Sequence, residues 1–262
     1  MCKKKRQSGF TLIELLVVLA ILTVLTSILS LSMAGVKDMT RRITCASNMR
    51  QLMLAYQLYS QDKRELPGGG NWVGCITRSD VDGNTSSAVT NGVIYPYTRD
   101  ISLYRCPASW YDYYVSYTVN WSFGQRAIDP QGTIIRKFTE ILDPASALVL
   151  LEEFDARGWN WGSMVLKFPG QPDWPVGWPL QWTDSVAGNH KAGYDTTYNG
   201  ACSPPVPARG DNLAFADGHV EFWVWKEWFT LLGGIGAHDS SRDAPGSTDL
   251  LRLEPVFNLW HP

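Results

Sequence analysis

The sequence feature that most constrains the fold is a long apolar stretch near the N-terminus. From Leu15 to Leu31 every residue is apolar, Thr or Ser, and extending the stretch back to Phe10 adds only Thr11 and Glu14 as polar interruptions. These roughly 22 residues would form about 33 Å of helix, which is enough to cross a bilayer. We therefore expect residues 10–35 to be the transmembrane half of an N-terminal helix.

The nine residues before this stretch form a basic leader. Residues 3–6 are three lysines and an arginine, but three further basic residues closely follow the apolar stretch, so charge alone favours a cytoplasmic N-terminus only slightly. An ordinary signal peptide has its small-residue cleavage site after the apolar run, whereas here the small pair Ser8-Gly9 precedes it. If cleavage occurs there, the apolar helix stays on the mature protein.

A helical pattern continues beyond the apolar stretch. Pro67, followed by three glycines, is a strong stop signal, and Gly35 is the interior position most prone to bending. We therefore predict one helix from Phe10 to Arg64, with residues 36–66 as its amphipathic half. Its apolar stripe recurs at steps of three and four residues and consists of Val36, Met39, Ile43, Ala46, Met49, Leu52, Tyr56 and Tyr59.

Glu14 is a carboxylate inside the apolar stretch. Placing a charge in hydrocarbon costs at least a few kcal/mol, so such a group is retained where it finds a partner. If the chain were cut after Gly9, Phe10 would carry a free α-amino group, and ammonium and carboxylate on adjacent chains would neutralise each other. The alternative is an interfacial glutamate tolerated in a signal anchor.

The segment GFTLIELL, which follows the basic leader and opens the apolar helix, resembles the class III signal of type IV pilins and type II secretion pseudopilins. The resemblance implies cleavage between Gly9 and Phe10 by a prepilin peptidase, N-methylation of Phe10, and a role for Glu14 in assembly. It also implies a cytoplasmic leader at residues 1–9 and a single-pass inner-membrane protein with a periplasmic domain. Assembly with other pilin or pseudopilin subunits would then give a periplasmic or extracellular filament.

Later segments resemble large prepilin-like proteins with a processing-associated His-to-Asp-Gly C-terminal domain. The resemblance is carried by CASNMRQL at 45–52, YRCP at 104–107 and DNLAFADGHV at 211–220. In that family the histidine lies much closer to the Asp-Gly pair, whereas 26 residues separate His190 from Asp217 here. Residues 191–210 therefore resemble an insertion, and the resemblance carries no role for His190.

Beyond residue 66 the pattern changes to short strand-like runs broken by Pro, Gly, Asn and Asp. Two of these runs flank Asp217-Gly218, the preferred pair of a two-residue type I′ hairpin. We predict an α+β, pilin-like fold, in which the long helix packs on an antiparallel sheet with long loops. The C-terminal globular β-rich domain would span residues 67–262. Strands are expected at 72–76, 113–121, 133–138, 147–152, 163–168, 212–216 and 219–225.

The triplet at 217–219 has two interpretations. A tight turn demands Asp-Gly for steric reasons alone, and this is the interpretation we favour. The alternative is a bound cation, calcium on loop carboxylates, with His190, Asp195 or Asp211 as further candidate ligands. We expect no other cofactor or metal.

The five cysteines lack CxxC spacing, which leaves zinc-ribbon and thioredoxin-like interpretations without support. Cys2 lies in the leader, and the other four lie beyond the apolar stretch, where an oxidising compartment would allow three pairings. We favour Cys45 with Cys106, which would tie the sheet to the helix, and Cys75 with Cys202. All four are free thiols if the compartment is reducing.

Enzyme motifs are absent from the sequence: it has no G-x-S-x-G elbow, HExxH, P-loop or dinucleotide fingerprint. Glu152-Glu153, at the end of a predicted strand, is interpreted as a polar boundary rather than an acid/base pair. Without its leader the chain would have a net charge of −6, which argues against nucleic-acid binding.

Five tryptophans lie in a stretch rich in proline and glycine. Aromatic side chains on loops complete a core or a subunit interface, or they stack on sugars and anchor partner proteins. The leading hypothesis is a noncatalytic filament subunit, and the alternative is a minor pilin or surface adhesin that binds glycan or protein through this Trp-rich region. The five are Trp159, Trp161, Trp174, Trp178 and Trp182.

Overall fold

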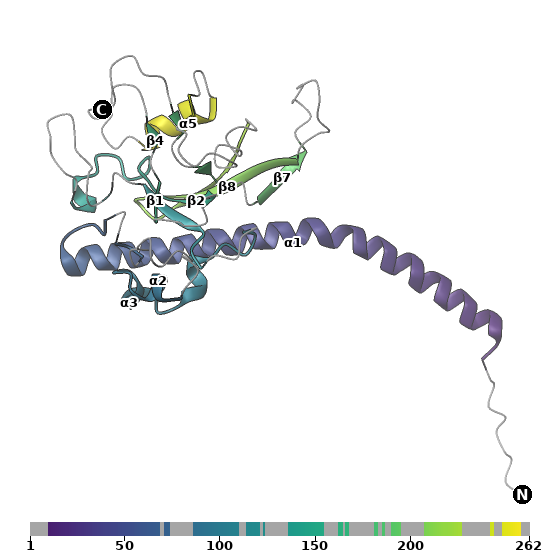
Figure 1. Ribbon diagram of the computed structural model, residues 1–262. Helices are drawn as coiled ribbons and strands as arrows, with labels where there is room; N and C mark the ends of the chain where they lie inside the picture. The colour runs from purple at the N-terminus through teal and green to yellow at the C-terminus, as the bar shows by residue number, and fades with distance from the viewer. Residues whose placement is uncertain are drawn as a thin grey trace, which may run out of the picture. The chain divides into compact units, whose positions relative to one another are not determined.

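The computed structural model describes residues 10–68, 71–73, 86–109, 114–120, 123, 136–154, 162–164, 166–167, 181–182, 185–186, 190–194, 207–226, 242–243 and 248–257. The chain divides into two compact units, residues 1–40 and 41–262. One helix, α1 (Leu12–Lys63), has residues in both units (Figure 1). The prediction of a single helix from Phe10 to Arg64 is confirmed, with small differences at its two ends.

Local interactions define both ends of α1. At its start, the backbone N–H and the hydroxyl of Thr11 both donate to Glu14 Oε2 at 2.8 Å, and Glu14 N donates to Thr11 Oγ1 at 3.3 Å. This reciprocal pattern is a capping box, which satisfies backbone donors that the first helical turn leaves without partners. At its end, Arg64 adopts a left-handed conformation with φ of 59°, which stops the helix before Pro67.

The first unit exposes its apolar side chains. Every described side chain from Phe10 to Ser27 is exposed, including Leu16 at 57%. The sequence predicted that residues 10–35 form a transmembrane half. Among the described residues, no helix combines the length and apolarity needed to cross a membrane.

The second unit contains a largely antiparallel sheet in the order β3-β1-β2-β8-β7, with β9 also paired to β8 and β6 to β2. Only the β1–β3 pair among these is parallel. A smaller antiparallel sheet has the order β10-β5-β4. The strands are β1 (Tyr117–Asn120), β2 (Leu148–Phe154), β3 (Ser163–Met164), β4 (Leu166–Lys167), β5 (Gln181–Trp182), β6 (Ser185–Val186), β7 (His190–Tyr194), β8 (Pro207–Phe215), β9 (Val220–Val224) and β10 (Arg242–Asp243).

Strand β8 changes partner along its length. Its C-terminal half pairs with β2, with Leu213 opposite Leu151, whereas its N-terminal half pairs with β7, with Gly210 opposite His190. Strand β9 runs along the other side of β8 over both halves, from Ala214 to Gly210. The end of β2 and the start of β7 therefore meet beside the middle of β8.

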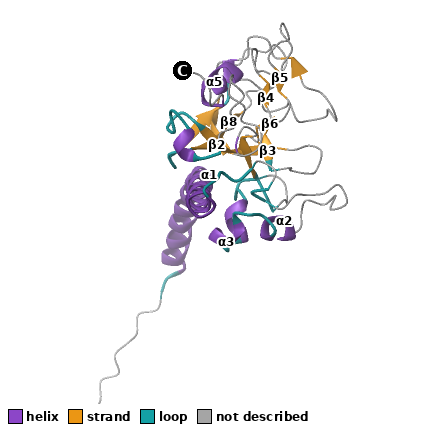
Figure 2. Cartoon of the chain, turned by 90° about the vertical axis from the view of Figure 1, so that its left-hand side faces the viewer, coloured by secondary structure: helices purple, strands orange, loops and turns teal. Residues whose placement is uncertain are grey.

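Within the second unit, α1 lies between the sheet and the short helices α2 (Ser86–Thr90), α3 (Tyr95–Thr98) and η1 (Ile101–Tyr104) (Figures 1 and 2). Because both sides of this part of α1 are covered, its buried residues extend beyond one stripe and include Cys45 and Met53. The predicted stripe is buried from Met49 to Tyr59. Its first residues, Val36, Met39 and Ile43, are exposed.

Two predicted strands lie partly outside the described residues, at 74–76 and 133–135, and the residues of them that the structure describes are not in strands. Trp72, expected in a strand at 72–76, lies in a turn, and Phe138, expected in a strand at 133–138, begins the 3-10 helix η3 (Phe138–Glu140). Trp72 is fully buried, stacks on Tyr104 with 5.8 Å between ring centroids, and donates its ring N–H to Gly162 O. The apolar character of Trp72 therefore reflects packing in the core beside α1 and η1 rather than membership of a strand.

The predicted hairpin is confirmed as β8 and β9, but its turn type is wrong. A type I′ turn needs positive φ at both central residues, and only Gly218, with φ of 94°, has it here. Gly218 N donates to Phe215 O at 2.9 Å, and Phe215 N donates to His219 O at 3.0 Å. These bonds enclose a three-residue loop at 216–218, in which the glycine takes the left-handed position of a bulge.

Helix α5 (Thr248–Phe257) packs against the end of this hairpin. The Asp249 carboxylate accepts the backbone N–H of Lys226 at 2.9 Å, and the Arg252 guanidinium lies 3.8 Å from the centre of the Trp223 ring. Both contacts hold α5 beside the end of β9 and the residues that follow it.

Candidate functional site

The N-terminal motif occupies the start of α1. Phe10 lies two residues before the helix and is 84% exposed, and Gly9 lies outside the described residues. The Glu14 carboxylate accepts the two hydrogen bonds from Thr11 that form part of the capping box. The carboxylate therefore has a local role in the uncleaved chain, which the sequence analysis did not foresee, in addition to the predicted pairing with a neighbouring N-terminus.

A second site is a buried cluster of metal-ligating and titratable side chains in the second unit. One candidate ligand atom from each of Cys45, Cys106, Glu152 and His190 lies within 4.8 Å of the other three. All four residues are buried, with Glu152 and Cys45 fully inaccessible. Among the described residues, this is the one group of three or more His, Cys, Asp or Glu side chains placed to share an ion.

The four residues come from separate segments that the fold brings together. Cys45 projects from α1, and Cys106 follows η1. Glu152 belongs to β2 and His190 opens β7, so both lie where β8 exchanges one strand partner for the other. The partner change on β8 thus creates the site, because it places two strand ends against the same stretch of α1.

One oxygen atom is the centre of the cluster. Glu152 Oε1 accepts from Cys45 Sγ at 2.8 Å and lies 3.0 Å from His190 Nε2. It also accepts from Asn212 N at 3.1 Å and from Asn212 Nδ2 at 3.2 Å. A carboxylate offers about four acceptor sites over two oxygens, so four donors on one oxygen is a crowded arrangement.

The electrostatics of the cluster favour protonated donors around a carboxylate. Burial by itself lowers the pKa of His190, but the Glu152 carboxylate and the Cys106 thiol outweigh it and raise that pKa to about 10. The imidazolium of His190 is therefore paired with Glu152 in the interior. Burial raises the pKa of Cys45 well above its usual value, and Cys106 and Glu152 raise it further, so Cys45 remains a thiol that donates.

Both sulfur atoms receive further hydrogen bonds. Tyr117 Oη donates to Cys45 Sγ at 3.3 Å, and Ala108 N donates to Cys106 Sγ at 3.4 Å. Cys45 and Cys106 are free thiols in the structure. A disulfide between these two cysteines is the pairing that the sequence analysis favours. In the structure their sulfur atoms lie close together but are not bonded. Cys75 and Cys202 lie outside the described residues.

From the sequence, Cys45 and Cys106 are predicted to form a disulfide, His190 is a candidate calcium ligand, and Glu152 has no ligand role. The interpretation of Glu152 as a polar boundary is wrong, because its side chain is fully buried. The missed signal is a pair of acids directly after the apolar run 147–151. Such a run is typical of a strand buried on both faces, so the acids that continue it, Glu152 and Glu153, are buried as well.

The candidate calcium ligands do not gather around Asp217 in the described residues. Asp217 Oδ1 accepts from His219 Nδ1 at 2.6 Å, while Asp211 accepts the Trp225 ring N–H at 2.7 Å. His190 belongs to the buried cluster, and Asp195 lies outside the described residues. The calcium site therefore stays a prediction.

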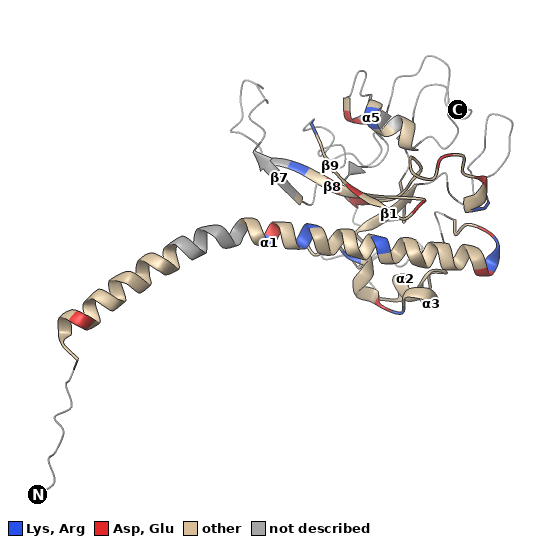
Figure 3. Cartoon of the chain, turned by 180° about the vertical axis from the view of Figure 1, so that it is seen from behind, with Lys and Arg blue, Asp and Glu red and all other residues tan. Residues whose placement is uncertain are grey.

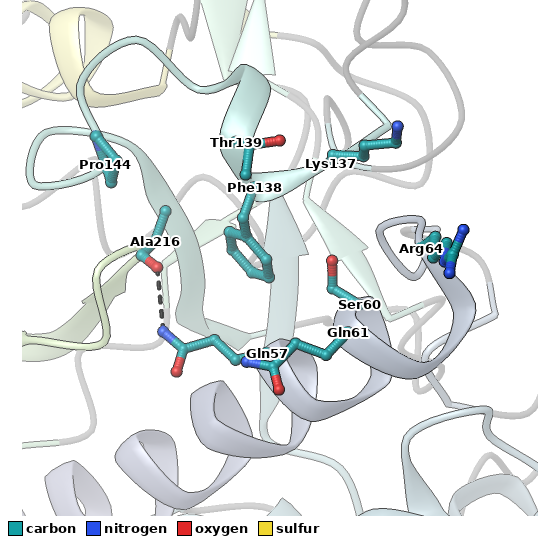
Figure 4. A pocket seen from close by; sticks show the side chains of 9 residues that line it. All are labelled: Gln57, Ser60, Gln61, Arg64, Lys137, Phe138, Thr139, Pro144 and Ala216. Atoms are coloured by element: carbon teal, nitrogen blue, oxygen red, sulfur yellow. Dashed lines mark hydrogen bonds between the residues drawn. The ribbon is translucent and has the colours of Figure 1, made fainter.

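An open pocket of about 510 Å³ lies beside the last turns of α1 (Figure 4). Gln57 Nε2 donates across it to Ala216 O at 3.4 Å, so the pocket separates α1 from the turn between β8 and β9. It presents no group of three potential metal ligands among the described residues. Of the Trp-rich region, only Trp182 is among the described residues, in β5, and the other four tryptophans lie outside them.

Comparison with known proteins bears on the N-terminal motif. Residues 4–30 match the family model described as the prokaryotic N-terminal methylation motif. No curated protein and no solved structure matches the chain. The resemblance of the C-terminal part to His-to-Asp-Gly proteins therefore stays a prediction. The chain carries a prepilin-type N-terminal motif, which supports a type IV pilin-like protein.

Proposed function

We propose that this chain is a noncatalytic structural subunit of a type IV pilus or type II secretion pseudopilus-like filament. In this proposal a prepilin peptidase cuts between Gly9 and Phe10, and Phe10 is then N-methylated. The N-terminal part of α1 first anchors the subunit in the inner membrane and later packs against other subunits. The second unit faces the periplasm and becomes the outer body of the filament.

One observation carries the proposal: the matched motif leads directly into a helix whose described N-terminal side chains are all exposed. Between residues 10 and 36 the sequence has one charged residue, Glu14, in the first turn of α1, where Figure 3 shows the red of an acidic residue. Exposed apolar side chains in such number favour burial against lipid or against other chains. The capping box would keep this surface helical from its first turn.

The experiment is mass spectrometry of the N-terminus after co-expression with a prepilin peptidase. We expect the wild-type chain to begin with N-methylated Phe10 and the Gly9→Leu variant to retain Met1 or Cys2 at its start. A matched Ser8→Leu variant, changed at the neighbouring position, should still be cut. If the wild type kept its leader while a known prepilin in the same cells lost its own, the proposal would be wrong.

A further inference from the structure

The buried cluster contains the donor set of a closed metal site. Its two thiols, one imidazole and one carboxylate present four candidate ligand atoms, none more than 4.8 Å from another. In a tetrahedral zinc site with bonds of about 2.0 to 2.3 Å, ligand atoms lie about 3.3 to 3.8 Å apart. We propose that Cys45, Cys106, Glu152 and His190 bind one divalent transition-metal ion of the zinc class.

The kind of ion follows from the ligands. Thiolates are soft donors that favour zinc and related transition metals, whereas calcium and magnesium require sets of oxygen ligands. Two sulfurs, one nitrogen and one oxygen match a tetrahedral zinc site. This ion differs from the calcium considered at Asp217, because the described residues around that turn form no group of three or more candidate ligands.

Crowding around Glu152 supports an ion in the same space. Cys45 Sγ, His190 Nε2 and two nitrogens of Asn212 all point at Glu152 Oε1. A bound cation would replace the thiol protons and the Nε2 proton, which would leave to bulk water, and it would coordinate the sulfurs, the nitrogen and the carboxylate directly. Only Asn212 would then continue to donate to the carboxylate.

The surrounding donors suit thiolate ligands. Ala108 N donates to Cys106 Sγ, and Tyr117 Oη donates to Cys45 Sγ. Asn212 N and Nδ2 hold Glu152, and Asn212 Nδ2 also donates to Arg42 O on α1 at 3.3 Å. Such outer contacts orient ligands and disperse their negative charge. These hydrogen bonds would remain after the protons of the cluster had left.

The site would be structural. Four protein ligands complete the coordination sphere of a tetrahedral ion and leave no position for a substrate. All four residues are also buried. The ion would join α1 to the segment after η1 and to two strands of the sheet. This inference does not depend on processing or filament assembly, since it concerns the second unit alone.

The test uses the full-length chain, purified in detergent with a thiol reductant and then titrated with Co²⁺ as a spectroscopic probe. We expect binding of about one ion per chain, visible absorption bands of the intensity typical of tetrahedral cobalt, and sulfur-to-cobalt charge-transfer bands. Added Zn²⁺ should remove these bands by displacement. A folded, reduced wild-type chain that bound no Co²⁺ or Zn²⁺ would overturn the proposal.

Variants assign the ligands. Cys45→Ser and Cys106→Ser should each weaken the charge-transfer bands, and His190→Asn should lower Co²⁺ affinity at least about tenfold. His219→Asn is the matched control, because that histidine is partly exposed and pairs with Asp217. Equal affinities of the two histidine variants would overturn the ligand assignment. Circular dichroism of each variant separates lost binding from lost folding.

A disulfide is the competing use of the same sulfurs. Cells would be alkylated before lysis and the protein then mapped by peptide mass spectrometry, which should find Cys45 and Cys106 without a disulfide between them. Metal should copurify with the protein when chelators are omitted from the buffers. A Cys45–Cys106 disulfide in nearly all chains, without bound metal, would overturn the proposal for the protein in its own compartment.

Discussion

The two parts of α1 form one continuous helix but have opposite surroundings. In the first unit, described side chains from Phe10 to Ser27 are exposed although most of them are apolar. In the second unit, residues from Cys45 to Tyr59 include eight buried side chains, which lie between the sheet and three short helices. The difference indicates that the second part stabilises the fold, whereas the first part is available for contacts outside the chain.

The largest expected effect is a difference in the free energy of unfolding between matched substitutions in the two parts of α1. Leu52→Ala should lower the free energy of unfolding by about 2 to 5 kcal/mol, because Leu52 is fully buried and its loss leaves a cavity. Leu16→Ala, the same change at a side chain that is 57% exposed, should alter it by less than about 0.5 kcal/mol. Denaturant unfolding of the full chain, followed by near-ultraviolet circular dichroism, measures both. Equal losses would contradict the division.

The second prediction separates the two roles of Glu14. Glu14→Gln preserves the capping pattern but removes the charge, so filament assembly should fall at least about tenfold if an ammonium on a neighbouring chain must be neutralised. Thr11→Val removes the capping hydroxyl and leaves the carboxylate, so assembly should continue while the first helical turn loses about 1 kcal/mol.

Filament yield by shearing and electron microscopy measures this pair of variants, with cleavage of both confirmed by mass spectrometry. Normal assembly of Glu14→Gln together with failure of Thr11→Val would show that capping, rather than charge pairing, explains the glutamate.

A smaller effect concerns two tyrosine hydroxyls in the second unit. The hydroxyl of Tyr56 is buried and has no hydrogen-bond partner among the described residues, so Tyr56→Phe should leave the free energy of unfolding unchanged or raise it by up to about 1 kcal/mol. Tyr117→Phe removes the bond to Cys45 Sγ and should cost about 1 kcal/mol. Thermal and denaturant unfolding would show the contrast, and a larger loss for Tyr56→Phe would mean that its hydroxyl has a partner.

The smallest expected effect is a pH dependence of the free energy of unfolding that arises at the turn between β8 and β9. Gln57 of α1 donates a hydrogen bond to this turn. Partial burial raises the pKa of Asp217, but hydrogen bonds from the His219 backbone and ring outweigh it and lower that pKa below its usual value. A lowered folded-state pKa stabilises the protein above the unfolded value near pH 3.9 and loses this contribution as the pH falls through the folded value.

Because Asp217 is partly exposed, the contribution should be only a few tenths of a kcal/mol. Comparing wild type with Asp217→Asn at about pH 6 and about pH 3 by denaturant unfolding tests this, since the difference between the two proteins should shrink in acid. A difference that grew in acid would contradict the sign.

Long periodic patterns and turn chemistry made much of the fold predictable. The helix from Phe10 to Arg64 and the hairpin around Asp217-Gly218 both depend on signals that lie close together in sequence. The predicted type I′ turn at Asp217-Gly218 was wrong, because Asp-Gly also suits a three-residue loop in which only the glycine needs positive φ. The exposure of Val36, Met39 and Ile43 could not be predicted, because periodicity identifies an apolar face but not what covers it.

The buried cluster was beyond sequence reasoning because its members lie on separate segments of the chain. Pairing Cys45 with Cys106 placed two of the four residues together, and the structure brings them close as free thiols. Glu152 and His190 join them only because β8 changes partner between β2 and β7. Such a junction depends on strand register, which no local motif specifies.

The most direct test of the account is photolabelling of the processed chain from within the lipid phase. The processed chain would be reconstituted in vesicles with a lipid-soluble carbene precursor and illuminated, and the labelled residues would be mapped by mass spectrometry. The account predicts label on the first part of α1, around Leu16, and none on the buried residues around Leu52. Equal labelling of the two parts, or no label before residue 40, would contradict it.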